Sequence, residues 1–358
     1  MSRALDPDTA ISIQKANSQT IYRDLVSALS TNTIGPLEIE FLPKSYTLAP
    51  DCNVLVEGNN IAVTKIKLVQ AFIVARAIFF NYMRECTEAQ ESELRDVTAV
   101  MLLLDPEHLT AVNTRKRLIQ RREDGPGNRL EELLRQELLF VDGYLTSRLH
   151  RHTKSPTLWG HRRWVLGKLK SLDVERDVFQ DLKSVILVAA ERHPQNYYAW
   201  SHMRWLVQVF GESPTRSIQG EKFPLDHSKL VSVVQNWCLK NPSDTSGFSF
   251  LLFCLFKSGS LSALARIELC SSVCADILKL AVSFRWIHES VWVFLRTVIA
   301  SEMATESIRI DFLQAINTIA NSRQGKKAVL ESAKGWYREN QQILQIDAID
   351  LVREEGVS

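Results

Sequence analysis

The sequence predicts an all-α protein, a right-handed α-α superhelix built as a solenoid of helical hairpin repeats. A cluster of large and basic residues recurs along the chain with a period in the forties, the range typical of helical repeat arrays. The segments between these clusters carry apolar residues at helical spacing. Hydrophobic residues make up 45% and charged residues 23% of the 358 residues, as in an ordinary globular protein with its own core.

The clearest copies of the repeat are "SPTLWGHRRWVL" (155–166) and "NYYAWSHMRWLV" (196–207), which align on a tryptophan. The same frame finds one large residue in each of five copies, called slot residues below: Val112, Trp159, Trp200, Phe248 and Trp292. Their separations are 47, 41, 48 and 44 residues. We expect all five to be buried between hairpins and to act as structural anchors of the repeat.

Each slot residue lies in a pattern that predicts the start of a helix. Four residues earlier stands a polar residue, and Ser, Asn and Asp there can cap the first turn: His108, Ser155, Asn196, Asp244 and His288. Seven residues later stands an aliphatic one on the same helical stripe: Ile119, Leu166, Val207, Leu255 and Ile299. In three copies a proline two residues before the polar one ends the preceding helix: Pro106, Pro194 and Pro242. Hairpins are therefore expected to begin near 105, 155, 194, 242 and 288.

The other elements follow in chain order. The first twenty residues are interpreted as a frayed helix or tail, residues 39–63 as irregular or short-strand structure, and 64–86 as a long helix. Second helices of the hairpins are predicted at 130–145, 178–193 and 225–240, with a loop at 120–129. This divides the chain into an N-terminal segment (1–90), a helical repeat domain (91–345) and a tail (346–358).

Charge and composition exclude several classes of protein. A net charge of +2 does not mark a nucleic-acid binder. No apolar run approaches the roughly 20 residues needed to span a bilayer, and Met1–Thr9 lacks the apolar core of a signal peptide. The six cysteines form no CxxC pair, so we expect no metal on this chain and reduced thiols in a cytoplasmic protein.

The repeat resembles that of the protein prenyltransferase α-subunit family, whose hallmark is Asn-x-x-x-Trp followed by a His/Gln-Arg segment and a second aromatic. "NYYAWSHMRW" matches it nearly throughout and "SPTLWGHRRW" matches its second half. The resemblance covers roughly residues 95–300. "NVLVEGNNIAV", "LRDVTAVMLLLDPEH" and "SDTSGFSFLLF" extend it toward the branch of repeat-containing proteins within that family.

The resemblance implies an α subunit that wraps a separate β subunit of Rab geranylgeranyltransferase type. The β subunit is expected to carry the catalytic zinc and the isoprenoid pocket, so no cofactor is expected on this chain. The pair would bind geranylgeranyl diphosphate and a protein substrate at a shared site, and join the isoprenoid to a C-terminal cysteine by a thioether bond. The alternative is a non-catalytic helical-repeat scaffold that binds another protein.

The resemblance also places the candidate catalytic residues. The family's Lys-Asn-Tyr stretch corresponds to Gln195, Asn196 and Tyr197, so the lysine is missing here. Tyr197 is expected to contact the diphosphate. Met203 replaces the arginine that follows the motif histidine in the family. The motif histidine itself is His202. It either acts in catalysis or makes an interhelical hydrogen bond, like its equivalent His161.

The remaining motif residues have two interpretations. Trp164 and Trp205, like the slot tryptophans, are predicted to be core residues that join hairpins. The basic residues Arg115, Lys116, Arg162 and Arg163 either belong to solvated helix ends or dock an acidic face of the β subunit, a diphosphate or an acidic substrate.

Overall fold

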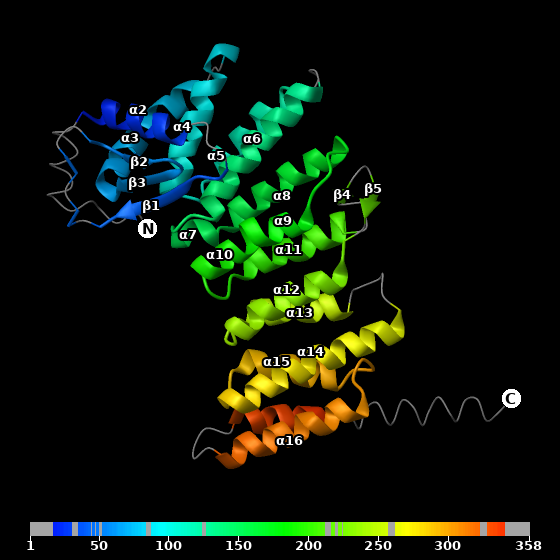
Figure 1. The fold of residues 1–358 in the computed structure, drawn as a ribbon. Helices are drawn as coiled ribbons and strands as arrows, with labels where there is room; N and C mark the ends of the chain where they lie inside the picture. The colour runs from blue at the N-terminus through cyan, green and yellow to red at the C-terminus, as the bar shows by residue number, and fades with distance from the viewer. Residues whose placement is uncertain are drawn as a thin grey trace. The chain divides into compact units, whose positions relative to one another are not determined.

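The computed structural model describes residues 17–30, 35–43, 45–46, 48–49, 52–83, 87–123, 127–211, 216–218, 221–223, 225–256, 262–322 and 328–340. The described chain is predominantly helical (Figure 1). It forms two compact units, Met1–Met203 and Arg204–Ser358. The all-α helical-repeat fold is confirmed, while the hand of the superhelix and the boundaries at residues 90 and 345 stay predictions. The predicted tail, 346–358, lies outside the described residues.

The first unit begins with a small sheet and two helices. These elements are α2 (Ser18–Leu29), β1 (Glu38–Leu42), β2 (Leu55–Glu57), β3 (Asn60–Thr64) and α3 (Lys65–Tyr82). The strand order is β1-β3-β2, with β1 parallel and β2 antiparallel to β3. The short strands and the long helix were both expected, although α3 ends at Tyr82, and residues 84–86 lie outside the described chain. The first sixteen residues of the expected tail are likewise undescribed.

The repeat helices of the first unit follow. They are η1 (Glu88–Gln90), α4 (Glu91–Leu104), α5 (Leu109–Gln120), α6 (Gly127–Leu145), α7 (His150–Thr153), α8 (Pro156–Ser171), α9 (Val178–Asp181), η2 (Leu182–Ile186), α10 (Leu187–Arg192) and α11 (Tyr197–Phe210), whose last residues belong to the second unit. The segment η2 is a π-helical turn between α9 and α10, so 178–192 is a nearly continuous second helix. The predicted loop at 120–129 is shorter than expected, because α6 already begins at Gly127.

The second unit continues the hairpins. Its elements are β4 (Arg216–Ile218), β5 (Glu221–Phe223), α12 (His227–Lys240), α13 (Thr245–Phe256), α14 (Ala263–Phe284), α15 (Glu289–Ile299), α16 (Glu306–Ser322) and a helix at 328–340. Strands β4 and β5 form an antiparallel hairpin that the sequence analysis did not predict. Helices α5, α11 and α13, which follow Pro106, Pro194 and Pro242, begin where expected.

The three predicted caps, Ser155, Asn196 and Asp244, are confirmed, and His108 caps its helix in the same way. The side chains of His108, Ser155, Asn196 and Asp244 accept bonds from backbone N–H groups three residues later, at 3.2, 3.1, 3.2 and 3.0 Å. His288 makes no side-chain cap bond. Each accepted bond satisfies one of the N–H groups that a helix start leaves without a helical partner.

The five slot residues and the five aliphatic residues that follow them are all buried, as predicted. Trp164 and Trp205 are only half-buried, so the prediction of a full core position is wrong for both. Each stands five residues after a slot residue, which is about 140° around the helix from the buried stripe. The Trp164 ring instead stacks on His161 and has the Nζ atoms of Lys116 and Lys168 at 5.7 and 5.9 Å.

In three places, successive repeats are joined through the carbonyl six residues before a slot residue. The Ser155 hydroxyl donates to the Pro106 carbonyl at 3.1 Å, and the Asn196 side-chain amide donates to the Thr153 carbonyl at 2.7 Å. The Ser290 hydroxyl donates to the Pro242 carbonyl in the same way. The Trp159 indole N–H also donates to the Thr153 carbonyl, at 2.9 Å. The residues that start one helix therefore fix the position of the preceding repeat.

Candidate functional site

The residues two and three positions after each slot residue point inward. In α5, Arg115 is buried and forms a two-bond ion pair with Glu137 of α6, with N–O distances of 2.7 and 2.8 Å. Its third nitrogen donates to the Arg95 carbonyl at 2.8 Å. This Arg–carboxylate geometry is the strongest kind of charged hydrogen bond, and it fixes α5 on α6.

His161 of α8 joins the same pair, because its Nε2 lies 2.6 Å from Glu137 Oε1. Burial would raise the pKa of the Glu137 carboxyl, but Arg115 and His161 outweigh burial and hold that pKa well below its usual value. Burial also lowers the pKa of His161, so the ring is neutral and donates its Nε2 proton to the carboxylate. The interhelical hydrogen bond expected of His161 is confirmed.

Arg162 carries a second buried network and is 0% exposed. It donates from Nε to Asp142 of α6 at 2.6 Å and from Nη2 to Asp181 of α9, which also binds Arg176. Burial would raise the pKa of Asp181, but Arg162 and Arg176 lower it to about 2. The network balances its charges and connects three helices.

His202 of α11 completes this network from the next repeat. Its Nε2 lies 2.8 Å from Arg162 Nη1, and its ring centroid lies 5.1 Å from that of Trp159. Burial, followed by the charge of Arg162, places the pKa of His202 well below its ordinary value, so the neutral ring accepts this bond. The buried interhelical bond fits His202 better than a catalytic role does.

Both interpretations of the basic residues, solvated helix ends and a docking surface, are wrong for Arg115 and Arg162. Arg115 and Arg162 are buried and paired, so neither is available to a partner. Lys116 is half-buried beside Trp164, and only Arg163 of the four is exposed. Arg115 and Arg162 therefore serve the interior instead of the surface.

The start of α11 holds the exposed part of the motif. Tyr197 and Tyr198 are 64% and 39% exposed, with ring centroids 5.6 Å apart in an edge-to-face arrangement. Gln195 is exposed and has a left-handed backbone with φ of 59°. Asn196 is buried, since its side chain caps α11 and binds the Thr153 carbonyl. Of the four candidate catalytic residues, only Gln195 and Tyr197 reach the surface.

This geometry can present a hydrogen-bond donor to an anion. Tyr197 is the first residue of a 14-residue helix, whose dipole favours negative charge at this end. Its phenol extends from that helix end. Edge-to-face contact with Tyr198 orients the two rings without covering their exposed sides.

Sequence reasoning missed the acidic partners in the interior. Glu137 and Asp142 lie within the apolar stripe of α6, among Leu134, Leu138 and Val141, all buried. Carboxylates at positions where helical periodicity demands apolar residues signal buried partners of opposite charge. That signal was present in the segment 130–145.

The described residues bring together no three His, Cys, Asp or Glu side chains able to hold a metal ion. All five described cysteines are free thiols. Burial raises the pKa of the Cys270 thiol to about 11. Within the described part of the chain, no helix combines the length and hydropathy needed to cross a bilayer.

Comparisons with known proteins add an independent line of evidence. A family model described as the ECM9 middle domain matches residues 158–276. The protein prenyltransferase alpha subunit repeat-containing protein 1 of Homo sapiens is 29% identical over 258 residues, which is 66% of this chain and 58% of that protein. The 1-B form of Xenopus laevis is 29% identical over 259 residues, covering 66% and 54%. The chain therefore spans about half the length of these curated relatives.

The chain is also similar to a protein that is named as the subunit of an enzyme. The geranylgeranyl transferase type-2 subunit alpha of Homo sapiens is 27% identical over 252 residues, covering 62% of this chain and 42% of that protein. A solved structure, Candida albicans protein geranylgeranyltransferase-I complexed with GGPP, matches 71% of this chain and 77% of its own with 15% identity and a TM-score of 0.34. A TM-score this low supports no argument about function. The sequence comparisons confirm the resemblance to prenyltransferase α subunits and, within them, to the repeat-containing proteins.

Proposed function

We propose that this chain is the α subunit of a heterodimeric protein geranylgeranyltransferase. The observation that carries the proposal is the exposed pair Tyr197 and Tyr198, at the start of the helix whose motif matches the family best. The similarity to a protein named as an alpha subunit supports it, because that name implies a second subunit. The pair would work in the cytoplasm, with a β subunit of the Rab geranylgeranyltransferase type.

The two subunits would divide the chemistry. The zinc of the β subunit would lower the pKa of a client cysteine, and the thiolate would attack the isoprenoid and displace diphosphate. The described residues of this chain would add charge stabilisation for that leaving group. The Tyr197 hydroxyl would donate one hydrogen bond, and the dipole of α11 would favour the anion. With Gln195 in place of a lysine, this contribution is modest.

Docking would use the edge where the repeat helices begin. In each repeat of the first unit, the residue three positions before the slot residue is exposed, with 62% exposure for Leu109 in α5 and 64% for Tyr197 in α11. Large apolar and aromatic side chains held outward by capped helices are typical of protein interfaces. The same edge would supply docking and the diphosphate contact.

A non-catalytic scaffold is the second candidate. The burial of Asn196 and His202 favours it, because it leaves few polar groups of the motif at the surface. A scaffold would bind its partner through the same exposed aromatic edge without contributing to transfer.

Coexpression with a Rab-type β subunit tests the proposal. We expect a stable one-to-one complex that contains zinc and transfers a geranylgeranyl group to a C-terminal cysteine of a client protein, whereas the chain alone does neither. Leu109→Asp combined with Tyr198→Asp should weaken assembly, while the exposed control Lys183→Asp should not. A chain that never forms the complex refutes the proposal, and a complex without transfer favours the scaffold.

A further inference from the structure

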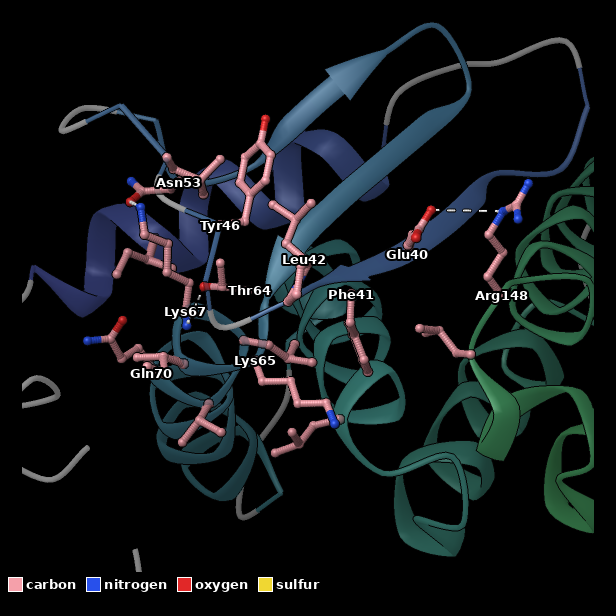
Figure 2. Close-up of a pocket in the computed structure, with 18 of the residues that line it drawn as sticks. Glu40, Phe41, Leu42, Tyr46, Asn53, Thr64, Lys65, Lys67, Gln70 and Arg148 are labelled. Carbon is pink, nitrogen blue, oxygen red and sulfur yellow. Dashed lines mark hydrogen bonds and ion pairs between the residues drawn. The ribbon is translucent and has the colours of Figure 1, made fainter. Parts of the chain in front are cut away.

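A cavity of about 1390 Å³ lies in the first unit, and Tyr197 is not among the described residues that line it. Its walls come from β1, the residues after it, and the start of α3, together with the segment around α7 (Figure 2). Small-molecule sites typically measure about 300–1,000 Å³. This cavity is larger and open to solvent, so its dimensions fit a segment of polypeptide better than a compact metabolite.

One side of the cavity is apolar. Phe41 and Leu42 at the end of β1 are half-buried, and Tyr46, which also lines the cavity, is 49% exposed. Figure 2 shows these side chains grouped near the start of α3. Apolar side chains gathered in a hollow lower their free energy when a partner covers them, which is typical of recognition sites.

The rim of the cavity is predominantly basic. Lys65, Lys67, Arg148 and Arg151 line it, and Glu40 is the one acidic residue among the described residues of the lining. Lys67 is held by the Cys52 carbonyl at 2.6 Å and by Asn53 at 3.0 Å. Among the described residues, these bonds leave its positive charge without a carboxylate partner.

The acidic groups beside the rim do not cancel its charge. Arg148 is 3.9 Å from Glu40, an exposed and weak ion pair, and Arg151 is 3.2 Å from Asp105. Lys65 lies 5.9 Å from the Phe41 ring and is exposed. Since α3 also begins here with Thr64 as its cap, its helix dipole adds to the positive potential.

We propose that this cavity binds an acidic, partly apolar peptide segment of a partner protein. Apolar side chains of the segment would lie on Phe41, Leu42 and Tyr46, and its carboxylates would face Lys65, Arg148 and Arg151. The site does not use Tyr197 or the edge of helix starts. It therefore stands whether or not the chain acts with a β subunit.

Fluorescence anisotropy with the full chain tests this site. The probe is a fluorescein-labelled twelve-residue peptide that alternates Glu with Leu and Phe, and its counterpart carries Lys in place of each Glu. We expect only the acidic peptide to bind, with an affinity that falls as salt rises. Lys65→Glu combined with Arg151→Glu should weaken binding by at least about tenfold, because two attractive charges become repulsive. Lys183→Glu, an exposed lysine of the same unit outside the cavity, should leave binding unchanged.

Tyr46→Ser tests the apolar wall and should weaken binding at unchanged salt dependence, with melting temperatures confirming that every variant folds. Equal affinity for the two peptides, or the same affinity in the double variant, overturns the proposal. Displacement of the peptide by millimolar inorganic phosphate alone would also overturn it in favour of a simple anion site. Binding to phosphatidylserine vesicles that depends on Lys65 and Arg151, without peptide binding, would overturn it in favour of a membrane surface.

Discussion

The early and the late repeats solve the same packing problem with opposite chemistry. At two and three positions after the slot residue, α8 has His161 and Arg162, whereas α15 has Phe294 and Leu295. All four side chains are buried. Helix α5 resembles α8 in burying Arg115, and α13 resembles α15 in burying an apolar pair. A buried slot residue is therefore common to these repeats, whereas the residues two and three positions after it can be ionic or apolar.

The two solutions differ in how strictly they specify the structure. An apolar pair needs packing neighbours of matching volume. Phe294 of α15, for example, packs against Phe248 of α13, with ring centroids 5.5 Å apart. A buried arginine needs particular acidic groups at particular distances, and each group left alone is costly. The ionic repeats are thus sensitive to the loss of any single member, and the apolar repeats are sensitive mainly to lost volume.

The largest difference should come from Arg162→Leu. It leaves Asp142 and Asp181 in the interior without their shared cation, so the free energy of unfolding should fall by about 3–5 kcal/mol. Urea unfolding measures it. The neighbouring Arg163→Leu is the control and should stay within about 0.5 kcal/mol, because Arg163 is exposed. Equal effects of the two would contradict the buried network.

Trp200→Ala should cost about 3–5 kcal/mol, as expected for a buried large-to-small change. Trp205→Ala on the same helix should cost clearly less, because Trp205 is half-buried. Both variants can be compared by urea unfolding. If Trp205→Ala lowered the free energy of unfolding as much as Trp200→Ala does, the slot residue would not be the main anchor of the repeat.

Acid should destabilise the ionic repeats before the apolar ones. Burial lowers the pKa of His152 to about 4, and the Asp181 pKa is about 2, both below the values of the unfolded chain. Depressed pKa values contribute stability that is present above the unfolded pKa and lost as pH falls through the folded one. For His152 the loss runs from about pH 6.5 to 4, and for Asp181 from about pH 4 to 2. Hydrogen exchange, corrected for its intrinsic rate, should lose protection in α6 and α8 at a higher pH than in α13 and α15.

The smallest expected effect belongs to the surface of the motif. In the reconstituted heterodimer, Tyr197→Phe removes one hydroxyl and should slow single-turnover transfer roughly tenfold to a hundredfold, equivalent to about 1–3 kcal/mol. Assembly should survive because the ring remains. Tyr198→Phe is the matched control and should transfer at the original rate. An unchanged rate in Tyr197→Phe would leave the catalytic contribution to the partner subunit.

The sequence predicted the helices well because caps, prolines and the aliphatic stripe are local features that one stretch of chain displays by itself. It failed for Arg162 because an arginine beside Arg163 looks like a surface patch until its acidic partners on α6 and α9 are known. The prediction also failed for Trp164 and Trp205. Their large side chains suggested burial, but their angular position on the helix, away from the buried stripe, did not. The β4–β5 hairpin carries little periodicity over two strands of three residues each.

The carbonyl six residues before the slot residue limits where the chain tolerates insertions and deletions. Thr153 O receives the indole of Trp159 and the amide of Asn196, and the Trp286 carbonyl receives the indole of Trp292 at the same spacing. One residue added inside that six-residue step would rotate the slot side chain out of the interior. The separations of slot residues vary from 41 to 48, so their length differences must arise elsewhere, in the second helices and their loops. Insertions at residues 173–175, before Arg176 of the buried network, should therefore be accepted, whereas a single insertion between Thr153 and Trp159 should disrupt two repeats.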